Sequence, residues 1–142
     1  MTTLDLWKDD YLVGVGKIDQ QHKILFSMLG ALLTLREDDG SIDERVAKVS
    51  SLVERLNNYA VYHFRTEEFL IDRHLAGDIS LVAHKEAHQS YAKSMQSFEG
   101  RFQAGDAGVV NDLIDFIYNW WLSHIMDTDK GLGMALNQAG VR

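Results

Sequence analysis

Residues 81–102 have the sequence LVAHKEAHQSYAKSMQSFEGRF, in which large apolar or ring-bearing side chains recur at intervals that alternate between three and four. The positions are Leu81, His84, His88, Tyr91, Met95, Phe98 and Phe102. This alternation follows the 3.6-residue repeat of the α-helix, so these side chains share one face. The stretch therefore predicts an amphipathic helix whose buried face carries two histidines.

Three further segments show the same periodicity, and the chain has no proline to interrupt it. We expect helices over about 19–37, 43–75, 81–104 and 107–128, and a short C-terminal helix near Leu132–Leu136. Asp19 is expected to be the N-cap of the first helix, and Asp38, Asp39 and Gly40 to end it. Residues 1–17 are expected to form an extended arm. Short loops between four helices favour an all-α, up-down-up-down four-helix bundle, with residues 1–142 in a single domain.

Composition excludes several classes of protein. The net charge is -7, which repels nucleic acids and anionic membranes, and the absence of cysteine rules out disulfides and thiolate metal sites. No apolar stretch reaches the roughly 20 residues of a membrane span, and Asp5, Asp9 and Asp10 argue against a secretory signal. We expect a soluble, cytoplasmic monomer that binds neither nucleic acid nor membrane.

Six ionisable side chains lie on the stripes that must face the core. They are His22, His63, Glu67, His84, His88 and His124. A lone buried histidine is usually a structural residue bonded to a carbonyl or water, but six unpartnered groups at roughly 2–7 kcal/mol each need a common explanation. The pairs His63 with Glu67 and His84 with His88 have i, i+4 spacing, so each pair can bind one metal or adjacent metals. His74, in the last turn of its helix beside Arg73, is expected to be structural or solvent-facing.

The donor types indicate which metals fit. Structural zinc takes four ligands in a tetrahedron, often with thiolate, whereas imidazoles with carboxylates suit iron or manganese, and a carboxylate can bridge two ions. Asp129 is the candidate second bridge. On an ideal helix it would point about 140° away from His124, so either a π-type turn or early unwinding brings it back, or Asp129 is an ordinary surface residue.

These features resemble the hemerythrin family, in particular the single-domain bacterial forms called bacteriohemerythrins. The resemblance covers nearly the whole chain. It rests on Trp7–Val15, Ile18–Lys23 (IDQQHK), His63–Phe64, Glu67–Glu68, His84, His88, Trp120, His124–Ile125 and Asp129–Lys130.

The resemblance implies two iron ions joined by a bridging oxo or hydroxo group. His84, His88 and His124 would hold one iron, His22 and His63 the other, and Glu67 and Asp129 would bridge them. One coordination position then stays open on the iron with two histidines, and dioxygen would bind there reversibly. An apolar oxygen pocket would be lined by Phe26, Phe64, Trp120, Trp121 and Ile125.

Two departures from the family pattern bear on function. Trp121 stands where the family usually has a leucine over the oxygen site, so a bulky indole is expected to narrow the pocket, slow entry or donate its N–H to a bound ligand. The segment between Glu67 and His84 lacks the family's methionine and Tyr-Pro pair, and a remodelled loop is expected there.

Three classes of function follow. The leading hypothesis is an oxygen-binding protein, not an enzyme, for storage, delivery or sensing, and a sensor would need a protein partner. The rival is a di-iron redox enzyme or sensor acting on peroxide or nitric oxide. The chain contains no Glu-x-x-His motif, which weakens a ferritin-like enzyme or an iron store. The third class is a metal-free interaction bundle in which the histidines are dispensable.

Overall fold

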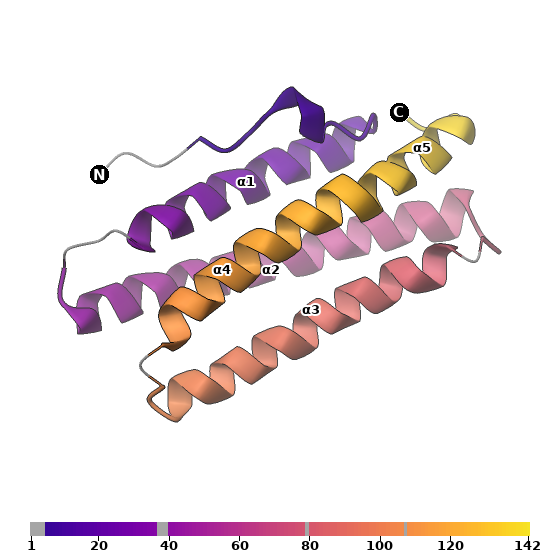
Figure 1. Cartoon of the computed structure of the whole chain (residues 1–142). Coiled ribbons are helices and arrows are strands. Elements are labelled where there is room, and N and C mark those ends of the chain that lie inside the picture. The colour runs from indigo at the N-terminus through magenta and orange to yellow at the C-terminus, as the bar shows by residue number, and fades with distance from the viewer. Residues whose placement is uncertain (1–4, 37–39, 79, 107) are drawn as a thin grey trace.

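The computed structural model describes residues 5–36, 40–78, 80–106 and 108–142, and every regular element in these ranges is a helix (Figure 1). In chain order the elements are the 3₁₀-helix η1 (Asp9–Tyr11), α1 (Gly16–Arg36), α2 (Ile42–His74), α3 (Ser80–Gln103), α4 (Val109–Ser123), the π-helix η2 (His124–Asp129) and α5 (Lys130–Gln138). The expected stop at Asp38 and Asp39 lies outside the described residues.

The helices α1 to α4 alternate in direction and form an up-down-up-down bundle, which confirms the predicted fold class (Figure 1). Their apolar stripes meet in one large core cluster, to which each of the four helices contributes. The cluster includes Leu25, Leu56, Tyr91 and Ile117, none of them more than 3% exposed. The arm that precedes α1 runs back along this helix (Figure 1).

Asp19 has a different role from the one predicted. The helix α1 begins at Gly16, and the Asp19 backbone N–H already donates to the Val15 carbonyl at 2.9 Å, so Asp19 lies in the first turn and is not the N-cap. Its carboxylate instead accepts the backbone N–H groups of Val13 at 2.7 Å and Gly14 at 3.3 Å. This buried carboxylate therefore fixes the end of the arm against α1.

The arm is held at both ends by apolar contacts. Tyr11 stacks on Phe26 of α1 with ring centroids 4.7 Å apart and an interplanar angle of 4°, and Trp7 meets Phe26 edge-on. Val13 belongs to a second, smaller apolar cluster with residues of α1, α2 and α5. Gly14, at φ +87°, makes the turn between Val13 and the start of α1 at Gly16, in a conformation that other residues rarely adopt.

The last three elements form one continuous helical rod. The helix expected to end near residue 128 instead passes from α4 through η2 directly into α5, with no break at the C-terminal helix. Within η2, the Lys130 N–H donates to the Ile125 carbonyl five residues earlier, which is the π-helical pattern. The predicted irregularity between His124 and Asp129 is therefore confirmed as a π-turn.

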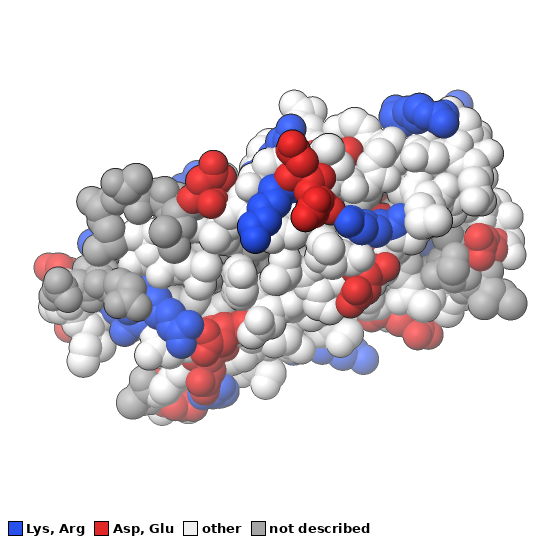
Figure 2. Space-filling model, turned by 45° about the horizontal axis from the view of Figure 1, so that its top comes forward, with Lys and Arg blue, Asp and Glu red and all other residues white. Residues whose placement is uncertain are grey.

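The described surface is mixed in charge. On the face drawn in Figure 2, basic groups are scattered among acidic ones without forming a continuous basic surface. Among the described residues, no helix is both long enough and apolar enough to cross a membrane.

Gly133 marks the closest approach between α5 and the arm, and it provides a test of this packing. A Cβ atom at Gly133 would lie 2.0 Å from the Val13 carbonyl oxygen, whereas one at Gly131 would meet nothing within 4 Å. Gly133→Ala is expected to lower the free energy of unfolding by roughly 1–3 kcal/mol through overpacking. Gly131→Ala, which makes the same change in the same helix, is expected to be neutral or stabilising. Urea unfolding followed by circular dichroism measures both, and equal stability of the two variants would contradict the packing described here.

Candidate metal centre

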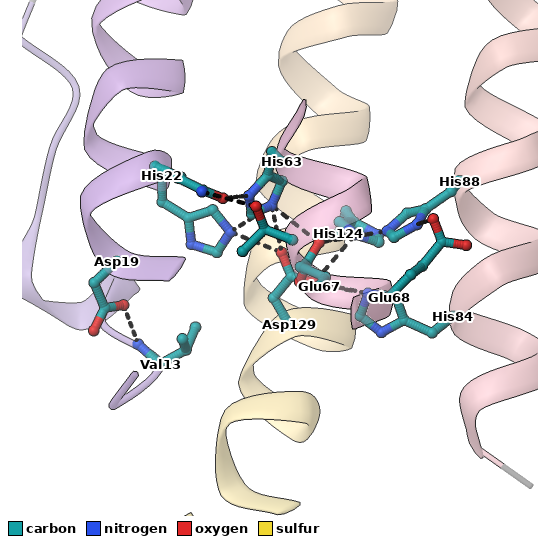
Figure 3. A network of polar contacts seen from close by, with 12 residues as sticks. Val13, Asp19, His22, His63, Glu67, Glu68, His84, His88, His124 and Asp129 are labelled. Atoms are coloured by element: carbon teal, nitrogen blue, oxygen red, sulfur yellow. Dashed lines mark hydrogen bonds and ion pairs between the residues drawn. The ribbon is translucent and has the colours of Figure 1, made fainter. Parts of the chain in front are cut away.

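The bundle brings seven ionisable side chains to one level of its core (Figure 3). The residues are His22 from α1, His63 and Glu67 from α2, His84 and His88 from α3, and His124 and Asp129 from the two ends of η2. Each is at most 5% exposed. All four bundle helices therefore contribute a side chain, directly or through the rod that continues α4.

The π-turn decides where Asp129 points. Because five residues of a regular α-helix advance about 140° beyond a full turn, an α-helical Asp129 would face away from His124. The π-helix has more residues in each turn, so a residue five positions later, such as Asp129 after His124, lies on nearly the same side of the helix. Asp129 is consequently fully buried, and its Oδ1 lies 3.1 Å from His124 Nε2. The alternative of a surface aspartate is excluded.

The two oxygens of Asp129 face different groups of histidines. Oδ1 lies 3.1 Å from His124 and 3.3 Å from His84, while Oδ2 lies 2.8 Å from His22 and 3.7 Å from His63. A carboxylate placed in this way can give one oxygen to each of two cations.

Glu67 also reaches both groups of histidines, but through one of its oxygens. Its Oε1 lies 3.0 Å from His63 Nε2 and 3.4 Å from His88 Nε2, and its Oε2 lies 3.4 Å from His84 Nε2. Two overlapping donor sets result, each with ligand atoms within 4.8 Å of one another. One set contains Glu67, His84, His88 and His124, and the other contains His22, His63, Glu67 and Asp129.

Many of the buried nitrogen and oxygen atoms in the two donor sets have no hydrogen-bond partner within the protein. In the described part of the chain, the buried side-chain nitrogens and oxygens without a hydrogen-bond partner belong, apart from Trp121 Nε1, to residues of the two sets. They include both oxygens of Glu67 and the Nε2 atoms of His84, His88 and His124. Because such atoms are costly to bury unsatisfied, this donor chemistry fits cations held by nitrogen and oxygen ligands.

The electrostatics of the metal-free site point to the same conclusion. Burial by itself lowers the pKa of His63, but the negative charges of Glu67, 3.0 Å from Nε2, and of Asp129, 3.7 Å from it, outweigh burial and raise the pKa to about 10. The pKa of His124 is raised in the same way, mainly by Asp129, to about 9. The pKa values of Glu67 and Asp129 are lowered despite their burial, because these imidazoles are their partners. In the metal-free protein, protonated imidazoles thus supply the positive charge that compensates the two buried carboxylates.

A polar relay between α1 and α2 fixes the orientation of His63. The Thr66 hydroxyl donates to the Tyr62 carbonyl at 3.1 Å, so it accepts from the Gln21 amide nitrogen at 3.0 Å. The Gln21 amide oxygen then lies 2.7 Å from His63 Nδ1, and because this oxygen only accepts, Nδ1 carries the proton. The His63 Nε2 is left to face the cluster, as a metal ligand requires.

Aromatic rings cover the cluster on the side of α2 and α4. Phe64 stacks on His88 with centroids 3.8 Å apart, and Trp120 stacks on His124 at 4.5 Å. Trp121 is fully buried, with its ring 5.9 Å from His63 and 6.1 Å from His124.

The other two residues expected in the oxygen pocket are buried in the same core cluster. Ile125 lies within η2 and is fully buried. The Phe26 ring contacts are with the arm residues Trp7 and Tyr11. His74 is exposed at the end of α2 and takes no part in the site, as expected.

Sequence reasoning assigned no role to Gln21, Thr66 or Glu68. Glu68 Oε2 lies 3.8 Å from His88 Nδ1, and the other two residues form the His63 relay. Adjacency in sequence to a candidate ligand was the available signal for Gln21 and Glu68. Thr66 follows His63 by three residues, which is one helical turn.

Comparison with known proteins identifies the same architecture. A family model described as the hemerythrin HHE cation binding domain matches residues 13–136. A bacteriohemerythrin of Clostridium acetobutylicum is 29% identical over 126 residues, which is 88% of this chain and 95% of that protein. One from Pseudomonas aeruginosa strain PAO1 is 31% identical over 126 residues, covering 89% of this chain and 77% of the relative. A crystal structure of wild-type hemerythrin superposes with a TM-score of 0.74 at 28% identity, covering 96% of this chain and 97% of that one.

Metal binding is expected to release protons. At pH 7 the raised pKa values keep His63 and His124 protonated in the metal-free protein, and a cation must displace those protons. Loading with ferrous iron under argon should therefore release on the order of two protons per chain. The apparent affinity for ferrous iron should rise with pH until about 9 to 10, because above the pKa values of the two imidazoles no proton has to be displaced. Calorimetric titration in two buffers of different ionisation enthalpy measures the release, and a buffer-independent enthalpy would contradict it.

Metal content tests the two donor sets directly. His88→Ala removes a buried donor from the set that contains His84 and His124, so the iron bound per chain should fall by about half or more. His74→Ala makes the same change at an exposed histidine and should leave the iron content unchanged. Iron analysis after reconstitution and gel filtration compares the two variants, and full occupancy in His88→Ala would exclude His88 as a ligand.

Proposed function

Because the chain belongs to the hemerythrin family, we propose that it holds two iron ions and binds dioxygen reversibly. The observation that carries this proposal is the pair of buried donor sets that share Glu67, with one Asp129 oxygen turned toward each group of histidines. In this proposal His84, His88 and His124 hold one iron and His22 and His63 the other. Glu67 and Asp129 bridge the pair.

The donor types support iron over zinc. The seven side chains offer five imidazoles and two carboxylates, which exceeds the four ligands of a structural zinc site, and the chain has no thiolate to offer. The division of histidines is unequal, three on one side and two on the other. The side of His22 and His63 therefore has fewer protein ligands, and we place the dioxygen pocket there.

When bound by these residues, a pair of ferrous ions would supply the reversible two-electron chemistry that dioxygen binding requires. The protein's part is to keep water and other reductants away and to hold the ligands in place. Trp121 is suited to the first task, because its fully buried ring lies close to His63. Gln21 is suited to the second, because its hydrogen bond with His63 Nδ1 fixes that ring. Such a protein serves storage, delivery or sensing of oxygen.

Trp121 also favours a second candidate function, a di-iron redox enzyme or sensor for peroxide or nitric oxide. Its indole fills space beside the two-histidine side, and its buried N–H has no hydrogen-bond partner in the described chain. An unpaired donor beside the pocket can bond to a bound ligand and change its reactivity. Under this alternative, dioxygen oxidises the centre irreversibly and the protein turns over the other substrate.

One experiment separates these functions. The iron-loaded protein is reduced, its visible spectrum is recorded before and after exposure to air, and oxygen is then removed under argon. Two irons per chain and a coloured adduct that disappears reversibly are expected. Irreversible oxidation, with steady turnover of hydrogen peroxide or nitric oxide, would establish the enzyme or redox sensor instead.

Trp121→Leu tests the role of the indole in the pocket. Replacing the ring by a smaller side chain opens space beside His63, so the rate of oxygen association in stopped-flow measurements should rise severalfold. Phe69→Leu also replaces an aromatic ring by leucine, but at an exposed position of α2, and should leave the rate unchanged. An unchanged rate in a folded, iron-loaded Trp121→Leu variant would show that the indole does not limit entry.

A further inference from the structure

A cleft of about 600 Å³ lies between α2 and α3, beside the aromatic cover of the metal centre. Phe64 and Tyr91 are among its lining residues, and Met95, Phe98 and Phe102 continue the wall along α3. Its volume falls within the range of small-molecule sites, roughly 300–1,000 Å³, and its wall is mainly apolar and aromatic. The size and the rings suit an aromatic or polycyclic molecule.

Apart from Tyr91, the polar residues that line the cleft are Ser50, Glu54, Asn57, Asn58, Gln96 and Glu99, and among them only the two glutamates carry a charge. The Tyr91 phenol donates its hydrogen to Asn57 Oδ1 at 3.1 Å, so its hydrogen is not free for a ligand. Burial raises the pKa of Tyr91, which keeps the phenol protonated. The carboxylates of Glu54 and Glu99 lie on opposite walls, one from α2 and one from α3, and both residues are exposed.

The charge of the cleft is negative. No lysine, arginine or histidine lines it, although Arg101 packs over the Phe98 ring at 5.5 Å. The guanidinium of Arg101 is already paired with Asp106 and Asp112, both at 2.7 Å. Two rim carboxylates and several ring faces remain for an incoming cation, since aromatic faces also attract positive charge.

We propose that this cleft binds an organic cation with an aromatic body, at a site separate from the metal centre. Rings such as Phe98 pack against the body, and Glu54 and Glu99 attract the charged group. None of the residues proposed to hold iron lines the cleft, and binding in the cleft does not require oxygen binding.

Phe64 gives the cleft a contact with the metal centre. This side chain lines the cleft and stacks on His88 with an interplanar angle of 16°, and it also lies parallel to Trp121 at 5.4 Å. Occupation of the cleft is therefore expected to shift the tryptophan fluorescence of the protein.

Three probes that share one ring system test the proposal on the metal-loaded protein. They are 2-naphthylmethylamine, which is cationic at pH 7, 2-naphthalenemethanol, which is neutral, and 2-naphthaleneacetate, the carboxylate of 2-naphthaleneacetic acid, which is anionic. Calorimetric titration at low salt should give the tightest binding for the amine, with an affinity roughly tenfold or more above that of the acetate. Equal affinity for the three probes, or no binding of the amine at millimolar concentration, would overturn the proposal.

Two pairs of matched variants locate the binding. Ala92→Phe fills the cleft from α3 and should weaken binding of the amine roughly tenfold, whereas Ala47→Phe, at an exposed position of α2 outside the cleft, should not. The double variant Glu54→Gln with Glu99→Gln should abolish the preference for the cation and keep the neutral probe. The double variant Glu44→Gln with Glu86→Gln, at exposed positions away from the cleft, serves as its control.

Circular dichroism and the oxygen response of each variant show that the fold and the metal centre are intact. Loss of cation preference in the control pair, or undiminished binding in Ala92→Phe, would place the site elsewhere. The oxygen response and probe binding are separate readouts, so failure of one proposal is distinguishable from failure of the other.

Discussion

Two carboxylates buried among five imidazoles impose the constraint on which the remaining structure depends. Glu67 and Asp129 are both 0% exposed, and a buried carboxylate is tolerated only when positive charge and hydrogen bonds compensate it. In the metal-free protein the compensation comes from imidazolium, as the raised pKa values of His63 and His124 indicate. Cations of higher charge would compensate the same carboxylates more completely, so the cluster suits a metal site.

The bundle meets this constraint by bringing a donor from every long helix to one level. Apolar clusters lie along the bundle and against the arm, so water has little access to the carboxylates. The arm is part of this seal, since Asp19 accepts two of its backbone N–H groups and Gly133 lets α5 approach Val13 closely. Packing far from the donors therefore affects the access of water to the site. It also affects the free-energy cost of burying the two carboxylates.

The aromatic cover around the cluster connects its chemistry with the surface. Phe64 stacks on His88, lies parallel to Trp121 and also lines the cleft between α2 and α3. Trp121 occupies the position beside His63 where a smaller residue would leave a larger pocket. Phe64 thus belongs both to the aromatic cover of the donor cluster and to the wall of an apolar cleft whose charged lining residues are Glu54 and Glu99.

The sequence alone determined the features that depend on local periodicity. The four helices and the histidines on their buried stripes follow from spacing along single chain segments. For Asp129 the spacing left a π-type turn, early unwinding or a surface position open, and the structure shows the π-turn. Tertiary structure decided what depends on distances between segments. Asp19 was predicted as an N-cap but bonds to the arm, and the relay from Thr66 through Gln21 to His63 joins two helices. Helical periodicity fixes the direction of a side chain about its own axis, whereas the partner it meets is fixed only when the helices pack.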